Sequence, residues 1–239
     1  MNLDAVWHDL ECGEYTEDLA LWRELADRTG GPVLDIGAGT GRVTLALAAL
    51  GLEVVALDSC APLLTALARR GEGHPVSTTV ADARDFRLDR RFSLILVPMQ
   101  TLQLLGGPSG RGAFLRCARA HLRSGGLLAA ALADAMDCFD DEHALPPAPQ
   151  ARTILGVLYS SQLLRVVEDD GRAAIHRRRE IVRAPDCRET DDVVVHLDGV
   201  SADQVEAEAR AVGFIPEPPL QIEETEQYLG STVIVLRAP

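Results

Sequence analysis

One segment constrains the fold of this chain more than any other. The run Val33-Leu34-Asp35-Ile36 leads into Gly37-Ala38-Gly39-Thr40-Gly41, and a second apolar run over 52–57 ends at Asp58. We expect a buried strand, a glycine turn, a helix and a second parallel strand that ends in an acid. A glycine turn lets a ligand approach the backbone closely, and a carboxylate can accept both hydroxyl groups of a ribose. The segment therefore predicts a nucleoside-binding site.

Alternating strand-like and helix-like runs continue to residue 134, and such alternation is typical of a doubly wound parallel sheet. With 239 residues and 47% hydrophobic content, the chain can bury one substantial core. We predict a single α/β domain with a helical N-terminal region (about 1–29) and a β insertion (about 137–199). The expected strands are 33–37, 53–57, 76–80, 94–97 and 127–132, the closing strands 214–215 and 232–236, and the helices 3–29, 42–50, 61–70, 112–122 and 201–212.

The insertion shows three β-like runs, 154–167, 173–183 and 193–197, with Asp169-Asp170-Gly171 as a hairpin turn between the first two. No helical pattern connects these runs, so we expect them to pair antiparallel. Alternation places Arg177 and Arg179 on one face, where they could meet an anionic substrate or a second subunit, or form an ordinary solvated face. The insertion could build a homodimer interface or a lid.

Charge and composition exclude several classes of protein. A formal net charge of -13 disfavours a surface for duplex nucleic acid. The five cysteines lack C-x-x-C spacing and the six histidines lack metal-ligand spacing, so we expect reduced thiols and no metal site. The chain shows no leader-like segment and no apolar run of spanning length, which favours a cytoplasmic protein without a membrane partner.

The spacing Asp35-x-Gly37-x-Gly39-x-Gly41 resembles the first motif of class I S-adenosylmethionine (SAM)-dependent methyltransferases. Ala81-Asp82-Ala83, the run 92–98 and the run 122–128 match further motifs in order, so the resemblance covers about residues 30–134. It implies a Rossmann-like methyltransferase fold whose mostly parallel seven-stranded sheet carries an antiparallel insertion after strand 5. It also implies SAM as cofactor and S-adenosylhomocysteine (SAH) as product.

The resemblance implies roles for residues around the cofactor. Gly37, Ala38 and Gly39, with the helix start at Thr40–Arg42, would hold the amino-acid end of SAM beside Asp35. Asp58 would accept the ribose hydroxyls, although a helix-capping role is the alternative. The adenine would lie between Ser59 and Leu63, with its amino group at Asp82 and a backbone N–H from Ala83; Asp82 could instead be a surface residue. Tyr15 would cover SAM through cation–π-like electrostatics, or simply belong to the core.

The segment Val97-Pro98-Met99-Gln100 ends the fourth strand, at the edge that faces the transferable methyl group in the family. It lacks the Asn/Asp-Pro-Pro-Tyr/Phe signature, which disfavours nucleic acid or protein glutamine as the acceptor. Gln100, Thr101 and Gln103 would line the substrate pocket or form a polar helix start. His143 is a candidate general base and Asp134 lies nearby in sequence, with a solvated loop as the alternative for His143.

We therefore expect a SAM-dependent methyltransferase that modifies nitrogen or oxygen of a small molecule, a class that includes secondary metabolites and sugars. The alternative is a SAM- or nucleoside-binding sensor or complex partner without turnover. A nicotinamide-dependent oxidoreductase is disfavoured because Arg42 stands where a dinucleotide fold needs its third glycine.

Overall fold

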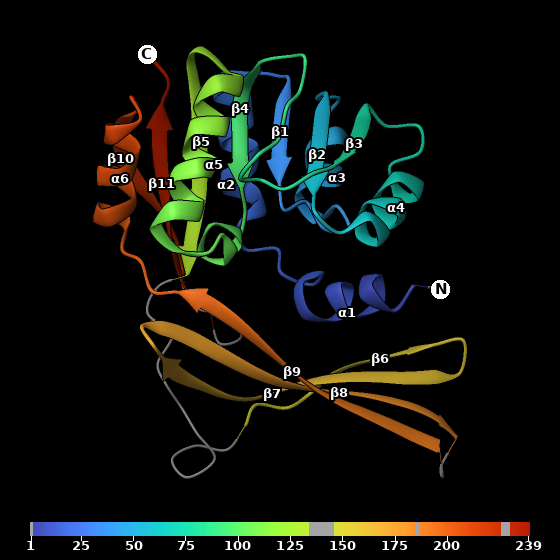
Figure 1. The fold of residues 1–239 in the computed structure, drawn as a ribbon. Coiled ribbons are helices and arrows are strands. Elements are labelled where there is room, and N and C mark those ends of the chain that lie inside the picture. Colours follow the sequence, from blue (N-terminus) through green and yellow to red (C-terminus); the bar gives the residue numbers. More distant parts are fainter. Residues whose placement is uncertain (1, 134–145, 185–186, 226–229) are drawn as a thin grey trace. The chain divides into compact units, whose positions relative to one another are not determined.

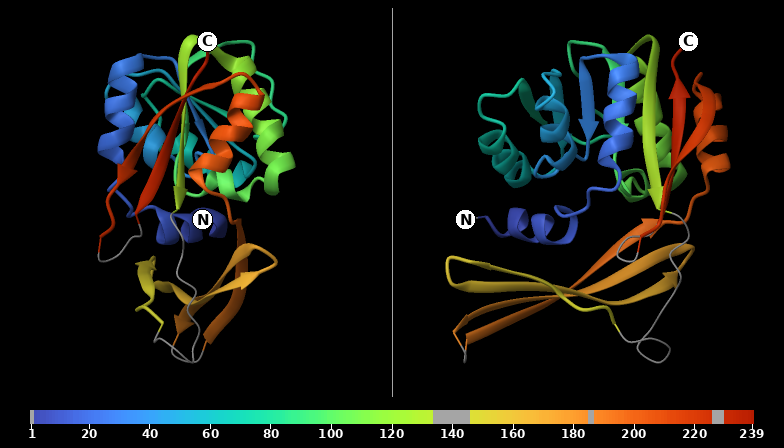
Figure 2. Two further views of the ribbon diagram at one scale, coloured as in Figure 1. Left: turned by 90° about the vertical axis from the view of Figure 1, so that its left-hand side faces the viewer. Right: turned by 180° about the vertical axis from the view of Figure 1, so that it is seen from behind.

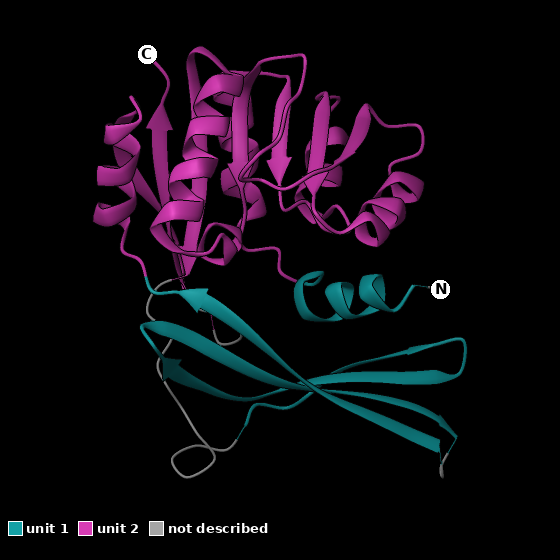
Figure 3. Cartoon of the chain, in the orientation of Figure 1, with its two compact units in different colours: residues 1–14, 135–199 teal, residues 15–134, 200–239 magenta. Residues whose placement is uncertain are grey.

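The computed structural model describes residues 2–133, 146–184, 187–225 and 230–239. The chain forms two compact units (Figure 3): the larger contains residues 15–134 and 200–239, and the smaller contains residues 1–14 and 135–199.

The larger unit is built on a seven-stranded sheet of order β10-β11-β5-β4-β1-β2-β3 (Figure 1). Strands β1 to β5 run parallel, whereas β11 runs antiparallel to both β5 and β10. The expected mostly parallel sheet with an antiparallel closing hairpin is thus confirmed. The strands are β1 Val33–Ile36, β2 Val54–Asp58, β3 Val76–Val80, β4 Phe92–Val97, β5 Leu122–Ala133, β10 Ile215–Ile222 and β11 Ser231–Arg237.

Helices cover both faces of this sheet, which is why its central strands are apolar on both sides. Figure 2 (left) shows α2 on one side and α5 and α6 on the other. The helices are α2 Leu19–Thr29, α3 Arg42–Ala48, α4 Ala61–Arg70, α5 Gly107–His121 and α6 Ala202–Ala211, with the short 3-10 helix η1 at Thr101–Leu104. In the described ranges, no helix is long and apolar enough to cross a membrane.

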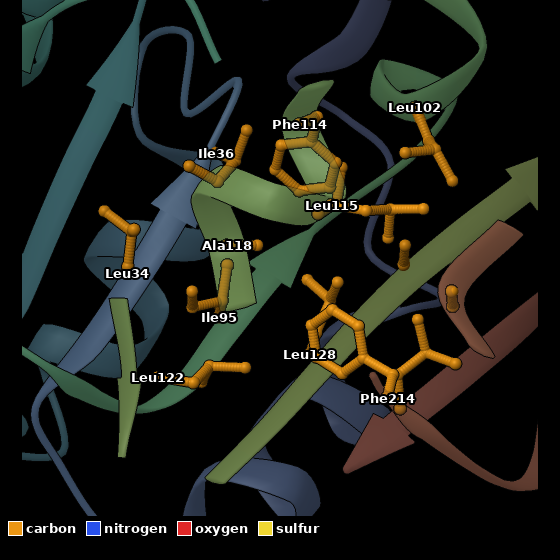
Figure 4. Packing of buried hydrophobic residues seen from close by; sticks show 14 of the residues in the cluster. Leu34, Ile36, Ile95, Leu102, Phe114, Leu115, Ala118, Leu122, Leu128 and Phe214 are labelled. Atoms are coloured by element: carbon orange, nitrogen blue, oxygen red, sulfur yellow. The ribbon is translucent and has the colours of Figure 1, made fainter. Parts of the chain in front are cut away.

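The main core lies between the sheet and α5 (Figure 4). Leu34, Ile95 and Leu128 of three neighbouring strands pack with Phe114 and Leu115 of α5, and all five are fully buried. Burying one such side chain contributes about 1.5–3 kcal/mol. The core therefore holds the central strands rigid, and with them the loops at their carboxyl ends.

The smaller unit contains α1 (Leu3–Cys12) and a four-stranded antiparallel sheet of order β6-β7-β8-β9. The antiparallel pairing and the turn at Asp170 (φ 51°) and Gly171 (φ 73°) confirm the predictions for the insertion. The first predicted run corresponds to β7, and the structure adds β6 before it, because the chain turns at Leu155 (φ 50°) and Gly156 (φ 79°). The strands are β6 Gln150–Ile154, β7 Val157–Asp169, β8 Arg172–Ala184 and β9 Cys187–Asp198.

The N-terminal region forms two helices, α1 and α2, where the sequence predicts one helical stretch over 3–29. The first helix ends at Gly13, whose N–H donates to the carbonyl of Asp9 at 3.0 Å. Trp7 of α1 packs edge-on against Tyr159 of β7, with ring centroids 5.7 Å apart. Tertiary packing thus assigns α1 to the smaller unit, and α2 belongs to the larger one.

Candidate functional site

The glycine turn joins β1 to α3 at the carboxyl edge of the sheet. Gly37, Gly39 and Gly41 have φ values of 69°, 55° and 99°, a left-handed region that other residues rarely adopt. The N–H groups of Gly37 and Ala38 donate to the carbonyl of Leu57 at 2.8 and 3.1 Å. The turn is therefore fastened to β2, and its glycines carry no side chains of their own that would keep a ligand away from the backbone.

A second loop, after β4, packs directly on this turn. A Cβ atom at Gly37 would lie 2.6 Å from the side chain of Thr101, so only glycine fits there. The hydroxyl of Thr101 donates to the carbonyl of Pro98 at 3.0 Å, and Met99 between them has a strained φ of 54°. The sequence-predicted residues Pro98–Thr101 thus lie beside the glycine turn.

Gln103 of η1 is buried, and its side-chain oxygen accepts a hydrogen bond from the N–H of Ala133 at 2.9 Å. This bond ties η1 to the end of β5, which gives Gln103 a structural task that the sequence analysis did not anticipate.

Asp58 connects the glycine turn to the start of α4. Its Oδ2 accepts from the N–H of Gly39 at 2.9 Å, and its Oδ1 accepts from the N–H of Cys60 at 2.8 Å. The side chain is half-buried. A carboxylate has about four lone-pair sites, so two backbone bonds leave capacity for hydroxyl donors.

The residues expected around the adenine differ in their surroundings. Leu63 is buried on α4, whereas Ser59 is exposed. Asp82 is also exposed, and the Arg84 guanidinium holds its carboxylate with bonds of 2.6–3.1 Å. These hydrogen bonds lower the pKa of Asp82. Ala83 is partly buried and packs against the main core.

Asp35 of β1 is fully buried directly before the glycine turn. Its Oδ2 accepts from the Thr44 hydroxyl at 2.6 Å, whereas its Oδ1 has no hydrogen-bond partner among the described residues. Burial raises the pKa of Asp35 to about 7, against the opposing effects of the Thr44 bond and the Arg42 charge. A carboxyl of this kind changes protonation near neutral pH, which is typical of functional positions.

Arg42 joins residues 15–18 to the glycine turn. Its Nη2 donates to Oδ2 of Asp18 at 2.8 Å, its Nη1 pairs with Oδ1, and Nη1 also donates to the Tyr15 carbonyl at 2.9 Å. The guanidinium lies 4.9 Å from the centroid of the Tyr15 ring. Tyr15 itself is buried among Trp22, Leu25 and other apolar side chains.

Asp18 is absent from the sequence-predicted site, although its carboxylate is fully buried at this position. Its only sequence signal is its place just before the helix that begins at Leu19. Conversely, the candidates Asp134 and His143 lie outside the described residues.

Arg177 and Arg179 share a partner within the smaller unit that the sequence pattern did not predict. Glu11 of α1 accepts two bonds from Arg179 at 2.7 and 2.8 Å, and Arg177 lies 3.8 Å from the same carboxylate. Both arginine side chains are partly buried, at 18% and 23% exposed, and face this carboxylate rather than forming an ordinary solvated face. They fasten α1 to β8.

Residues 33–126 match a methyltransferase-domain family. The chain is also 31% identical over 144 residues to cypemycin N-terminal methyltransferase from Streptomyces sp, a match that covers 60% of this chain and 56% of that protein. The chain thus spans little more than half the length of this relative.

Solved structures with the same fold cover nearly the whole chain. The sugar N-methyltransferase KedS8 from Streptoalloteichus sp ATCC 53650 has a TM-score of 0.76 at 18% identity, over 99% of this chain and 93% of that one. SAM-bound CalS10, an amino pentose methyltransferase from Micromonospora echinaspora, has a TM-score of 0.72 at 18% identity, over 99% and 97%. The family match, the curated relative and the solved structures thus agree that residues 33–126 form a methyltransferase domain and that the chain is similar to class I SAM-dependent methyltransferases.

Proposed function

We propose that this protein transfers the methyl group of SAM to a nitrogen atom of a small molecule, such as an amino sugar or another secondary metabolite. The observation that carries the proposal is the meeting of three elements at one sheet edge. The glycine turn, Asp58 and the loop that begins at Pro98 are joined through Gly37–Thr101 packing and the Gly39–Asp58 hydrogen bond.

The residues at this edge fit SAM. The unpartnered, buried oxygen of Asp35 offers negative potential to a cationic ligand group. Asp58 is half-buried and retains lone pairs for ribose hydroxyls, and Leu63 gives an apolar wall for the adenine. We assign the amino-acid end of SAM to Asp35 and residues 37–42, the ribose to Asp58, and the adenine to the region of Leu63 and Asp82.

Nitrogen is favoured over oxygen as the accepting atom by the names of similar proteins. The curated relative is called an N-terminal methyltransferase, KedS8 a sugar N-methyltransferase and MtfA a glycopeptide N-methyltransferase. These names describe other proteins, and the amine acceptor is therefore our proposal for this one. The homodimer considered from the sequence likewise stays a prediction.

Bound SAM supplies an electrophilic methyl group. The amine lone pair forms the new N–C bond as the S–C bond breaks, the sulfur keeps the bonding electrons, and the nitrogen then releases a proton. The chain contributes alignment of the two reactants and exclusion of water. An amine that arrives neutral needs no general base for the transfer itself.

A methyl-transfer assay tests the proposal. The purified protein is incubated with SAM and paired acceptors that differ only in an amino or hydroxyl group at one position, and products are identified by mass spectrometry. We expect methylated amine together with SAH, and no methylation of the hydroxyl partner. Methylation of the hydroxyl compounds alone would refute the choice of nitrogen. Tight SAM binding without turnover of any acceptor would favour the non-catalytic alternative.

A further inference from the structure

Asp18 forms a buried ion pair next to the glycine turn. Its side chain is 0% exposed and that of Arg42 is 10% exposed. Besides Arg42, Oδ2 of Asp18 accepts a hydrogen bond from Trp22 Nε1 at 2.7 Å. Burying two charges gives little or no net stability compared with apolar packing. Stability alone therefore does not explain why this ion pair is buried here.

The charges of this pair act on the cofactor site. Arg42 is the first residue of α3, directly after Gly41, and it holds the carbonyl of Tyr15. The positive charge of Arg42 lowers the pKa of Asp35, and the negative charge of Asp18 raises it. Both charges thus influence the pKa of the Asp35 carboxyl, which precedes the glycine turn.

SAM carries a sulfonium cation, whereas SAH is a neutral thioether at the same atom. An uncompensated guanidinium beside the glycine turn would repel the sulfonium, and poor screening in a buried site would strengthen that repulsion. We propose that Asp18 is a positioning residue that fixes and neutralises Arg42, so that the site accepts the positively charged methyl donor in preference to its neutral product. This inference rests on the proposed function, because it assumes that SAM binds at this edge.

Isothermal titration calorimetry with SAM and SAH tests the inference. Asp18→Asn removes the compensating charge, and we expect its dissociation constant for SAM to rise about tenfold, the equivalent of one charge-assisted hydrogen bond. SAH should be affected much less, so the ratio of the SAM to the SAH dissociation constant rises. Arg42→Gln leaves Asp18 without its cation, and this ratio should fall.

The matched control is Glu208→Gln, which breaks the Arg111–Glu208 pair (2.7 and 3.0 Å) between α5 and α6 in the same unit. It should lower the melting temperature without changing either dissociation constant. Equal losses for SAM and SAH in Asp18→Asn, with an unchanged ratio in Arg42→Gln, would overturn the inference. If Asp18→Asn does not fold, Arg42→Gln alone tests the inference. A lower ratio of the SAM to the SAH dissociation constant then supports it, and an unchanged or higher ratio overturns it. Failure of the wild type to bind SAM would instead contradict the proposed function.

Discussion

At the scale of single residues, Asp35 makes stability depend on pH. Its pKa is raised from 3.8 to about 7 by burial. Between these values the folded protein binds a proton that the unfolded chain releases, so stability falls as pH rises and levels off above about 7. The loss is on the order of 4 kcal/mol. In Asp35→Asn, urea denaturation at several pH values should show a flatter profile over this window. An unchanged slope would mean that Asp35 is ionised when folded.

Asp58 permits a second prediction at this scale, because one carboxylate has both a structural and a proposed binding task. Asp58→Asn keeps an acceptor for one of the two backbone N–H groups, whereas Asp58→Ala removes both bonds. We expect calorimetry to show SAM binding weakened about tenfold or more in Asp58→Asn and abolished in Asp58→Ala. Substitution of the exposed Glu53 by Gln, in the Arg90 pair, is the control and should leave binding unchanged. Full affinity in Asp58→Ala would refute the ribose assignment.

At the scale of elements, the attachment of α1 to β8 depends on the carboxylate of Glu11. Burial opposes ionisation of Glu11, but the hydrogen bonds and charge of Arg179 outweigh it and lower its pKa. Glu11→Gln leaves Arg177 and Arg179 with an uncharged and weaker partner. We expect this change to lower the free energy of unfolding by about 2 kcal/mol. Hydrogen exchange should then accelerate in α1, while Glu189→Gln in an exposed pair on β9 should change little. Unaltered exchange in α1 would show that Trp7–Tyr159 packing alone holds the helix.

The elements also show what the sequence can reveal. Parallel strands were predictable because burial on both faces leaves continuous apolar runs, as in β4. The cap of α6 was predictable too, since Ser201 and Gln204 form a reciprocal capping box. The turn at Leu155 was missed because leucine is rare at positive φ. The Glu11–Arg179 pair joins residues 168 positions apart, and Asp18 carries no motif, so local patterns could reveal neither.

At the scale of the whole molecule, the two units should respond differently to ligand. SAH at about 100 times its dissociation constant should stabilise the folded larger unit by about 2.7 kcal/mol. Hydrogen exchange measured with and without SAH should therefore slow most in β1, β2 and β4, and less in β6 to β9. Greater protection of the smaller unit than of the larger one would place the ligand outside the proposed site.

Because residues 1–14 pack with residues 135–199, the first helix is not a detachable tail. Trimming the start of the chain would strip the antiparallel sheet of Trp7 and leave two arginines facing no counter-ion from α1. A chimera that exchanges the inserted sheet with that of a relative must accordingly import both segments together, although more than a hundred residues separate them in the gene.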